Sequence, residues 1–256
     1  MDMTFRIVQI TDTHIYADIN KCLYGVNTNQ SLIGVVEAVL ARDVRPDLLV
    51  LTGDLVHDDG VEAYQRLNAL LQALPVPGYV IPGNHDVPEV MRSYFSEREL
   101  RWLDRVCVQG WQLLFLDSSA KGEISGVLKR ELLAALRMHL DSCGLPTVIF
   151  LHHHVLPVGS AWLDRIGLVN ANEFLAEIKH YPQVKAVVNG HVHQEFEYKN
   201  EQGVYFWGTP SSCAQFKPAV DKFAIDDVSP GWRVIELTGD GEITSHIERV
   251  TNRISA

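Results

Sequence analysis

Long hydrophobic runs are missing from this sequence of 256 residues. Its apolar stretches, such as residues 48–51, are short, and none reaches the roughly 18 residues that a membrane-spanning helix needs. Residues 1–6 also lack the basic and apolar regions of a signal peptide. We therefore expect a cytoplasmic protein that has no membrane partner.

Cysteine and positive charge are also scarce. The four cysteines are widely separated and form no C-x-x-C pair: Cys22, Cys107, Cys143 and Cys213. This pattern favours buried free thiols over disulfides or a zinc knuckle. The net charge is −10 and no long basic run occurs. Because nucleic-acid-binding proteins normally present a positive surface, we exclude a nucleic-acid partner.

Neither an internal repeat nor a long linker divides the chain, and apolar runs alternate with segments of helical period. We expect strands at 5–10, 48–51, 79–81, 113–116, 148–151 and 184–188, and helices at 31–42, 62–73, 128–140 and 171–179. This alternation is typical of an α/β domain with a largely parallel sheet.

The pattern changes after His193. Residues 196–198, 204–207, 232–237 and 243–250 alternate apolar and polar side chains, with turn residues at 200–203 and 239–241. Such segments are typical of antiparallel strands joined by hairpins. We therefore expect residues 1–256 to form a single domain, to which about 194–250 contribute antiparallel strands.

Potential metal ligands follow five of the expected strands. They are Asp12 and His14, then Asp54, then Asn84, His85 and Asp86, then the triplet His152, His153 and His154, and finally His191 and His193. In open α/β sheets, functional sites assemble at the carboxyl ends of the strands. Clusters that are far apart along the chain can therefore meet at one point.

The residue types suit a pair of metal ions. Two ligands separated by one residue, as in Asp12-x-His14 and His191-x-His193, leave a strand end on the same face. Imidazole, carboxylate and amide donors without cysteine favour iron, manganese or zinc. Two such ions about 4 Å apart can bind phosphoryl oxygens and convert a bridging water to hydroxide near neutral pH. They would also bring positive charge to an acidic chain.

Each motif is ordinary by itself. Asp-x-His and His-x-His arise by chance in a chain with 11 histidines, a Gly-Asp pair commonly forms a turn, and the histidine triplet could be a solvated loop. Five clusters in order, each after an expected strand, argue for a site.

The remaining histidines fit no ligand pattern, and we expect them at the surface or hydrogen-bonded: His57, His139, His180 and His246. Asp58 could support a ligand or cap a helix, whereas Trp207 and Trp232 are expected in the core.

Together the five motifs resemble the calcineurin-like metallophosphoesterases. Four further segments, at 23–28, 161–164, 209–218 and 230–233, resemble the class III 3′,5′-cyclic-AMP phosphodiesterases of bacteria, so the likeness covers nearly the full chain. The resemblance implies a four-layer α/β/β/α sandwich of two mixed sheets flanked by helices. It also implies hydrolysis of 3′,5′-cyclic AMP, a small-molecule substrate, to 5′-AMP.

The resemblance assigns roles to individual residues. Asp12, His14 and His193 would hold one metal, often iron; Asn84, His191 and one histidine of the triplet would hold the second, which would be iron, manganese or zinc; and Asp54 would bridge both. We choose His152 from the triplet because it directly follows the strand, with His153 as the alternative. His14, Asp54, Asn84 and His193 would also border the substrate. His85 would act on the substrate, with Asp86 orienting it through a hydrogen bond.

Substrate choice should depend on residues outside the metal motifs. Trp162, in the loop 159–164, and Phe216, in the segment 209–218, offer rings on which a purine could stack, although both could equally pack their loops. One alternative function is hydrolysis of another small phosphodiester or a phosphomonoester. A second alternative is a non-catalytic protein-binding scaffold. The scaffold is disfavoured because all seven ligand positions and His85 are filled.

Overall fold

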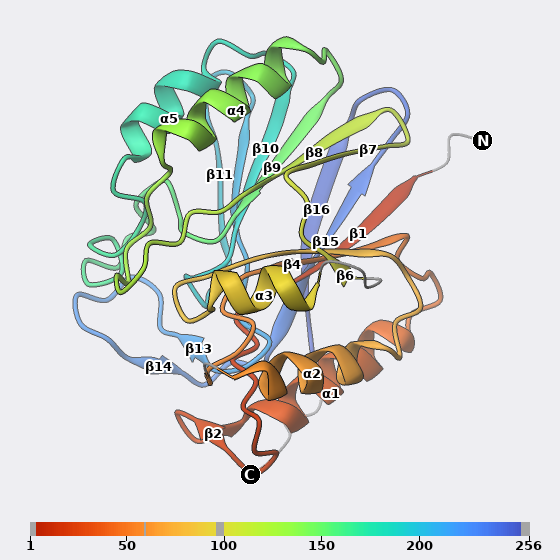
Figure 1. Cartoon of the computed structure of the whole chain (residues 1–256), viewed down its shortest axis with the longest axis vertical. Coiled ribbons are helices and arrows are strands. Elements are labelled where there is room, and N and C mark those ends of the chain that lie inside the picture. The colour runs from red at the N-terminus through yellow and green to blue at the C-terminus, as the bar shows by residue number, and fades with distance from the viewer. Residues whose placement is uncertain (1–3, 59, 96–99, 252–256) are drawn as a thin grey trace.

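Two six-stranded sheets form the centre of the computed structural model, which describes residues 4–58, 60–95 and 100–251 (Figure 1). The first sheet contains, in spatial order, β16 (Ile243–Arg249), β15 (Gly231–Leu237), β1 (Phe5–Ile10), β4 (Leu48–Thr52), β5 (Gly78–Ile81) and β6 (Leu100–Arg101). The second contains β11 (Phe196–Lys199), β12 (Tyr205–Gly208), β10 (Val184–Asn189), β9 (Thr147–Leu151), β8 (Trp111–Leu116) and β7 (Arg105–Val108).

Helices cover the outer face of each sheet. Helices α1 (Thr28–Leu40), α2 (Val61–Leu71) and α3 (Pro88–Tyr94) lie on the first sheet, and α4 (Arg130–Asp141) and α5 (Ala171–Ile178) lie on the second (Figure 1). Two short hairpins, β2 (Cys22–Leu23) with β3 (Val26–Asn27) and β13 (Gln215–Phe216) with β14 (Ile225–Asp226), complete the described elements. The expected four-layer α/β/β/α arrangement is confirmed.

Side chains that point alternately to the two faces of the buried strands form three separate hydrophobic cores. In β4, Leu48 and Val50 face the second sheet, whereas Leu49 and Leu51 face the helices α1 and α2. In β9, Val148 and Phe150 likewise face the first sheet, and their neighbours face α4 and α5. A strand that is covered on both faces is a nearly continuous apolar run, because successive side chains point to opposite faces. This explains why the apolar runs located the central strands.

Both sheets are mixed. Strands β1, β4, β5 and β6 are parallel, as are β8, β9, β10 and β12, while β7, β11, β15 and β16 pair antiparallel with their neighbours. The C-terminal strands were expected to be antiparallel, but β12 also pairs in parallel with β10. These strands are shared between the sheets, since residues 196–208 extend the second and residues 231–249 extend the first.

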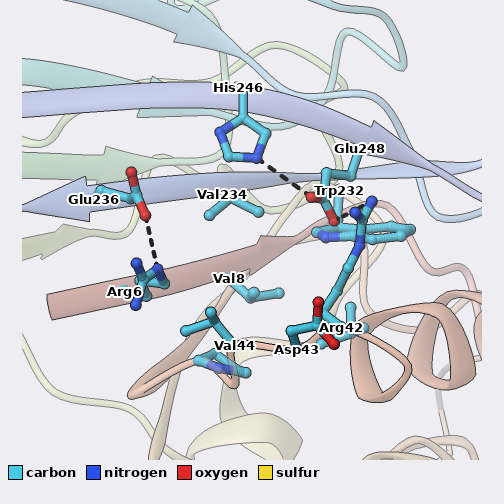
Figure 2. Close-up of a pocket in the computed structure, with 12 residues that line it drawn as sticks. Arg6, Val8, Arg42, Asp43, Val44, Trp232, Val234, Glu236, His246 and Glu248 are labelled. Atoms are coloured by element: carbon cyan, nitrogen blue, oxygen red, sulfur yellow. Dashed lines mark hydrogen bonds and ion pairs between the residues drawn. The ribbon is translucent and has the colours of Figure 1, made fainter. Parts of the chain in front are cut away.

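Ion pairs cover the outer face of the first sheet where α1 does not reach. Arg6 and Glu236 are direct partners across β1 and β15 and form an ion pair of 2.7 Å. Figure 2 shows this pair together with the Glu248 carboxylate, which forms ion pairs with Arg42 and His246. These residues line a groove of about 250 Å³. Opposite charges across neighbouring strands stabilise their pairing. None of the residues that line this groove lines the cavity that contains His14 and Asp54.

The thiols are free, as expected, but only Cys213 is buried. Cys22 and Cys107 are exposed and Cys143 is intermediate, so the expectation that all four are buried was wrong. Trp207 and Trp232 lie in the core, as predicted. Among the described residues, no helix combines the length and the hydrophobicity needed to cross a membrane.

Candidate metal centre

The five ligand clusters meet at the carboxyl ends of strands from both sheets. The first sheet supplies Asp12 and His14 after β1, Asp54 after β4 and Asn84 after β5, and the second supplies His152 after β9 and His191 and His193 after β10. The two sheets are joined here, because the backbone N–H of His191 donates to the Asp12 carboxylate at 3.0 Å. Residues from opposite ends of the chain thus lie in one buried cluster.

Two groups of donor atoms have the spacing of metal sites. In the first, the Nε2 atom of His193 lies 3.1 Å from Asp12 Oδ1 and 3.3 Å from His14 Nε2. In the second, the Nε2 atom of His152 lies 3.4 Å from Asp54 Oδ1 and 3.2 Å from His191 Nδ1. In the sets Asp12–His14–His193 and Asp12–Asp54–His152, one ligand atom of each residue lies within 4.8 Å of those of the other two.

Asp54 lies between the two groups. Its Oδ2 atom is 3.8 Å from His14 Nε2, and its Oδ1 atom is 3.4 Å from His152 Nε2, so its two oxygens face opposite groups. Asp54 and Asn84 line one cavity, and the buried Oδ1 atom of Asn84 has no hydrogen-bond partner among the described residues. A buried amide oxygen without a donor is costly unless a cation or another donor meets it. The donor set therefore fits a pair of hard or borderline metal ions.

Hydrogen bonds to backbone carbonyls fix the orientation of three histidines. Nδ1 of His152 bonds Thr52 O at 2.7 Å, Nδ1 of His193 bonds Ala214 O at 2.8 Å, and Nε2 of His191 bonds Ile166 O at 3.1 Å. Each of these ring nitrogens faces a carbonyl that can only accept, so in a neutral ring the other nitrogen carries a lone pair that points into the cluster. This arrangement is characteristic of metal-binding histidines.

The three histidines of the triplet have different partners. Both nitrogens of His153 are engaged elsewhere, Nδ1 with the Ser118 hydroxyl at 2.8 Å and Nε2 with Ile124 O at 3.0 Å. The Nε2 atom of His154 faces the Asp164 carboxylate at 4.0 Å. Of the triplet, His152 places a ring nitrogen, Nε2, 3.4 Å from Asp54 Oδ1, which supports its choice over His153.

The backbone of the cluster is unusual. Five ligand candidates adopt the left-handed region that favours glycine: Asp12, His14, Asp54, His191 and His193, with φ between 45° and 67°. Such a residue costs about 1–3 kcal/mol in backbone strain, and the surrounding structure must enforce it. Gly190 permits this crowding, since a Cβ atom there would overlap Thr11 Oγ1 and lie 2.8 Å from Asp12 Oδ2.

Burial and charge determine the protonation of the ligands. Burial lowers the pKa of His14 to about 3, so its ring is neutral and can donate a lone pair. Burial opposes ionisation of Asp54, but the facing rings of His152 and His14 outweigh it and hold the pKa of this carboxyl well below its usual range. Burial alone would lower the pKa of His152, yet Asp54 raises it to about 9. The cluster therefore attracts positive charge between Asp54 and His152.

His85 and Asp86 behave differently from each other. The His85 ring is exposed at the cavity, and its backbone N–H donates to Asp54 Oδ1 at 2.9 Å. The prediction that Asp86 forms a hydrogen bond with the His85 ring was wrong. The Asp86 carboxylate turns inward and accepts hydrogen bonds from Gly83 N at 2.8 Å, from Leu55 N at 3.1 Å and from the Tyr64 hydroxyl at 3.1 Å. Burial raises the pKa of Asp86 to about 7. Asp86 thus joins the loops after β4 and β5 and does not orient the His85 ring.

His57 was not expected at the site. Its Nδ1 atom lies 3.3 Å from His14 Nδ1, and its ring stacks on His85 with 4.6 Å between ring centroids. No ligand pattern contains His57, and only its position three residues after Asp54 could have indicated it. Asp58 serves neither of its expected roles, since its carboxylate accepts the backbone N–H of Ala17 at 2.8 Å and α2 begins after Gly60.

Aromatic rings surround the opening above the ligands, a cavity of about 200 Å³. Trp162 and Phe216 both line it, as expected, with ring centroids 5.3 Å apart. Phe216 is only 9% exposed because its ring lies flat on the His193 imidazole, at 4.0 Å and an interplanar angle of 3°. One face of Phe216 is therefore covered by a ligand candidate.

Comparison with known proteins agrees with this geometry. The calcineurin-like phosphoesterase family model matches residues 5–195. Proteins of Vibrio vulnificus and Escherichia coli named 3′,5′-cyclic adenosine monophosphate phosphodiesterase CpdA are 41% and 39% identical, covering 97% and 96% of this chain and 91% and 90% of their own lengths. The crystal structure of a dimetal phosphatase from Danio rerio shares the fold, with a TM-score of 0.67 and 16% identity over 94% of this chain and 98% of its own. The chain therefore belongs to the calcineurin-like phosphoesterase family.

Proposed function

We propose that this protein is a metal-dependent phosphodiesterase that hydrolyses 3′,5′-cyclic AMP to 5′-AMP in the cytoplasm. The observation that carries the proposal is the convergence of seven donor side chains below one cavity, in a chain about 40% identical to cyclic-AMP phosphodiesterases over nearly its full length. Hydrolysis would lower cyclic-AMP signalling. We also propose that the chain acts as a single catalytic domain.

The distances support a division of the proposed ligands between two ions. Asp12, His14 and His193 would hold one ion and Asn84, His152 and His191 the other, and Asp54 would serve both. Iron paired with manganese, iron or zinc suits the mixture of imidazole, carboxylate and amide donors. When bound, two such ions supply a nucleophile near neutral pH and neutralise charge on the phosphoryl oxygens.

The protein contributes a proton donor and a fixed orientation. Attack on phosphorus breaks the bond to the 3′ oxygen, which leaves with negative charge and must receive a proton. The exposed ring of His85 borders the cavity, so it can donate this proton or stabilise the charge. The hydrogen bond from its backbone N–H to Asp54 positions the backbone of His85 beside this ligand candidate.

The test is an assay of the purified, metal-analysed protein against a panel of cyclic nucleotides, a small chromogenic diester and a phosphomonoester. We expect two metal equivalents and preferential conversion of cyclic AMP to 5′-AMP. Preference for the monoester or for the small diester would favour the first alternative, another phosphoesterase activity. Full metal content without turnover of any compound would favour the second, a non-catalytic scaffold.

A further inference from the structure

Two rings at the mouth of the cavity are far more exposed than those below them. Tyr24 is 53% exposed and Phe223 is 44% exposed, and both line the cavity that contains His14, Asp54 and His85. Their ring centroids lie 5.2 Å apart. Phe216, in contrast, is buried against His193. Trp162 also lines the cavity but is intermediate in exposure, so Tyr24 and Phe223 are the most exposed of its tryptophan, tyrosine and phenylalanine rings.

Tyr24 occupies a turn position that tyrosine disfavours. The pairing of Leu23 with Val26 leaves Tyr24 and Gly25 as the two-residue loop of the hairpin β2–β3, with φ values of 50° and 83°. Positive φ at both positions defines the type I′ turn, which strongly prefers asparagine or glycine first and glycine second. A bulky side chain in this conformation is strained, and strain of this kind accumulates at ligand-binding positions.

Packing within the protein does not account for the tyrosine. Its ring makes edge or tilted contacts with Phe216 at 6.3 Å and Phe223 at 5.2 Å between centroids, and about half of the residue faces solvent. The backbone strain at Tyr24 lowers the stability of the hairpin, and the limited burial of its ring does not offset this cost. Its position above the metal ligands supplies a functional reason.

We propose that Tyr24 and Phe223 form an aromatic platform that holds the purine base of the cyclic nucleotide. This inference rests on the proposed function. A phosphate bound near Asp54 and His85 occupies the floor of the cavity, so the attached nucleoside must extend through the mouth, past these two rings. Every base presents a π-face to aromatic side chains, and stacking is therefore well suited to hold it there.

The test compares two substrates in single-residue variants. In Tyr24→Ala and in Phe223→Ala, we expect the KM for cyclic AMP to rise by about tenfold, from the loss of one stacking contact. The KM for ribose 3′,5′-cyclic phosphate, which has no base, should change by less than about twofold, because it cannot stack. Tyr24→Phe keeps an aromatic ring and should have the wild-type KM for cyclic AMP.

Two further variants separate binding from folding. Tyr198→Ala removes an equally exposed ring (49%) on β11, outside the cavity, and should leave both KM values unchanged. Tyr24→Asn places a preferred residue in the turn, so its Tm should be equal to or above that of the wild type while its KM for cyclic AMP rises as in Tyr24→Ala. A structural role for the tyrosine would lower the Tm as well.

The outcomes for the platform and for the proposed function are distinct. Wild-type turnover of cyclic AMP with an unchanged KM in Tyr24→Ala and Phe223→Ala would reject the platform alone. Equal losses on both substrates would also reject it, since the rings would then support the site as a whole. Absence of cyclic-AMP turnover by the wild type would reject the proposed function and the platform together.

Discussion

Replacement of Gly83 by alanine should disrupt the metal centre although no ligand is changed. Gly83 lies between β5 and Asn84, where a Cβ atom would overlap Asp54 Oδ1 and its backbone N and lie 2.8 Å from His152 Cε1. Overpacking costs about 1–3 kcal/mol, and a neighbouring backbone that cannot rotate away places this substitution at the upper end. At about 2–4 °C per kcal/mol for a chain of this size, the Tm should fall by about 6–12 °C.

The assay measures thermal unfolding and metal content of the same preparations. Gly83→Ala should also bind less than the wild-type amount of metal, because relief of the overlap moves either Asp54 or His152. Gly144→Ala is a matched control, since its added Cβ atom meets nothing within 4 Å. Its Tm should remain within about 2 °C of the wild type. A Gly83→Ala protein with wild-type Tm and metal content would refute the reasoning.

Three other predictions concern single residues. Asp54→Asn should lose turnover and at least one metal equivalent, because an amide lacks the charge of a bridging carboxylate; full metal content with a near wild-type rate, measured on one preparation, would exclude a bridge. His85→Ala should keep both metals while the rate falls by roughly 10²-fold or more, whereas loss of metal would identify His85 as a ligand. Burial raises the pKa of the Cys213 thiol to about 12, so iodoacetamide should modify it only after unfolding, while the exposed Cys22 and Cys107 react in the native protein. Labelling is measured by mass spectrometry, and equal labelling of all three thiols in the native protein would contradict the burial of Cys213.

The central strands could be predicted from the sequence because they are covered on both faces. Strands β4 and β9 are therefore nearly continuous apolar runs, with threonine only at one end of each, and polar ligand candidates follow them. Ligands placed by those ends, including Asp54 and His152, were found together for the same reason. The assignment of later strands to one sheet or the other depends on contacts far apart in sequence, and local patterns contain no information about it.

Features that depend on side-chain direction were missed. Asp86 was expected to meet the neighbouring His85, but donors from Leu55, Tyr64 and Gly83 hold it inward. His57 reaches the site through the loop after β4, and no period of the sequence indicates this. The left-handed backbone of His14 and Asp54 was also unforeseen, because tertiary contacts enforce it against the local preference of these residues.

The position of β1 in the first sheet has a consequence for synthesis. β1 emerges early from the ribosome and can pair with β4, but its other partner, β15, emerges near the end of translation. At typical bacterial and eukaryotic elongation rates the delay is on the order of 10–40 s. During that interval β1 presents an unpaired apolar edge, the kind of surface that aggregates or recruits chaperones. Truncation before β15 would make this transient state permanent, so yield of soluble protein should depend on the last two strands more than their distance from the metal centre suggests.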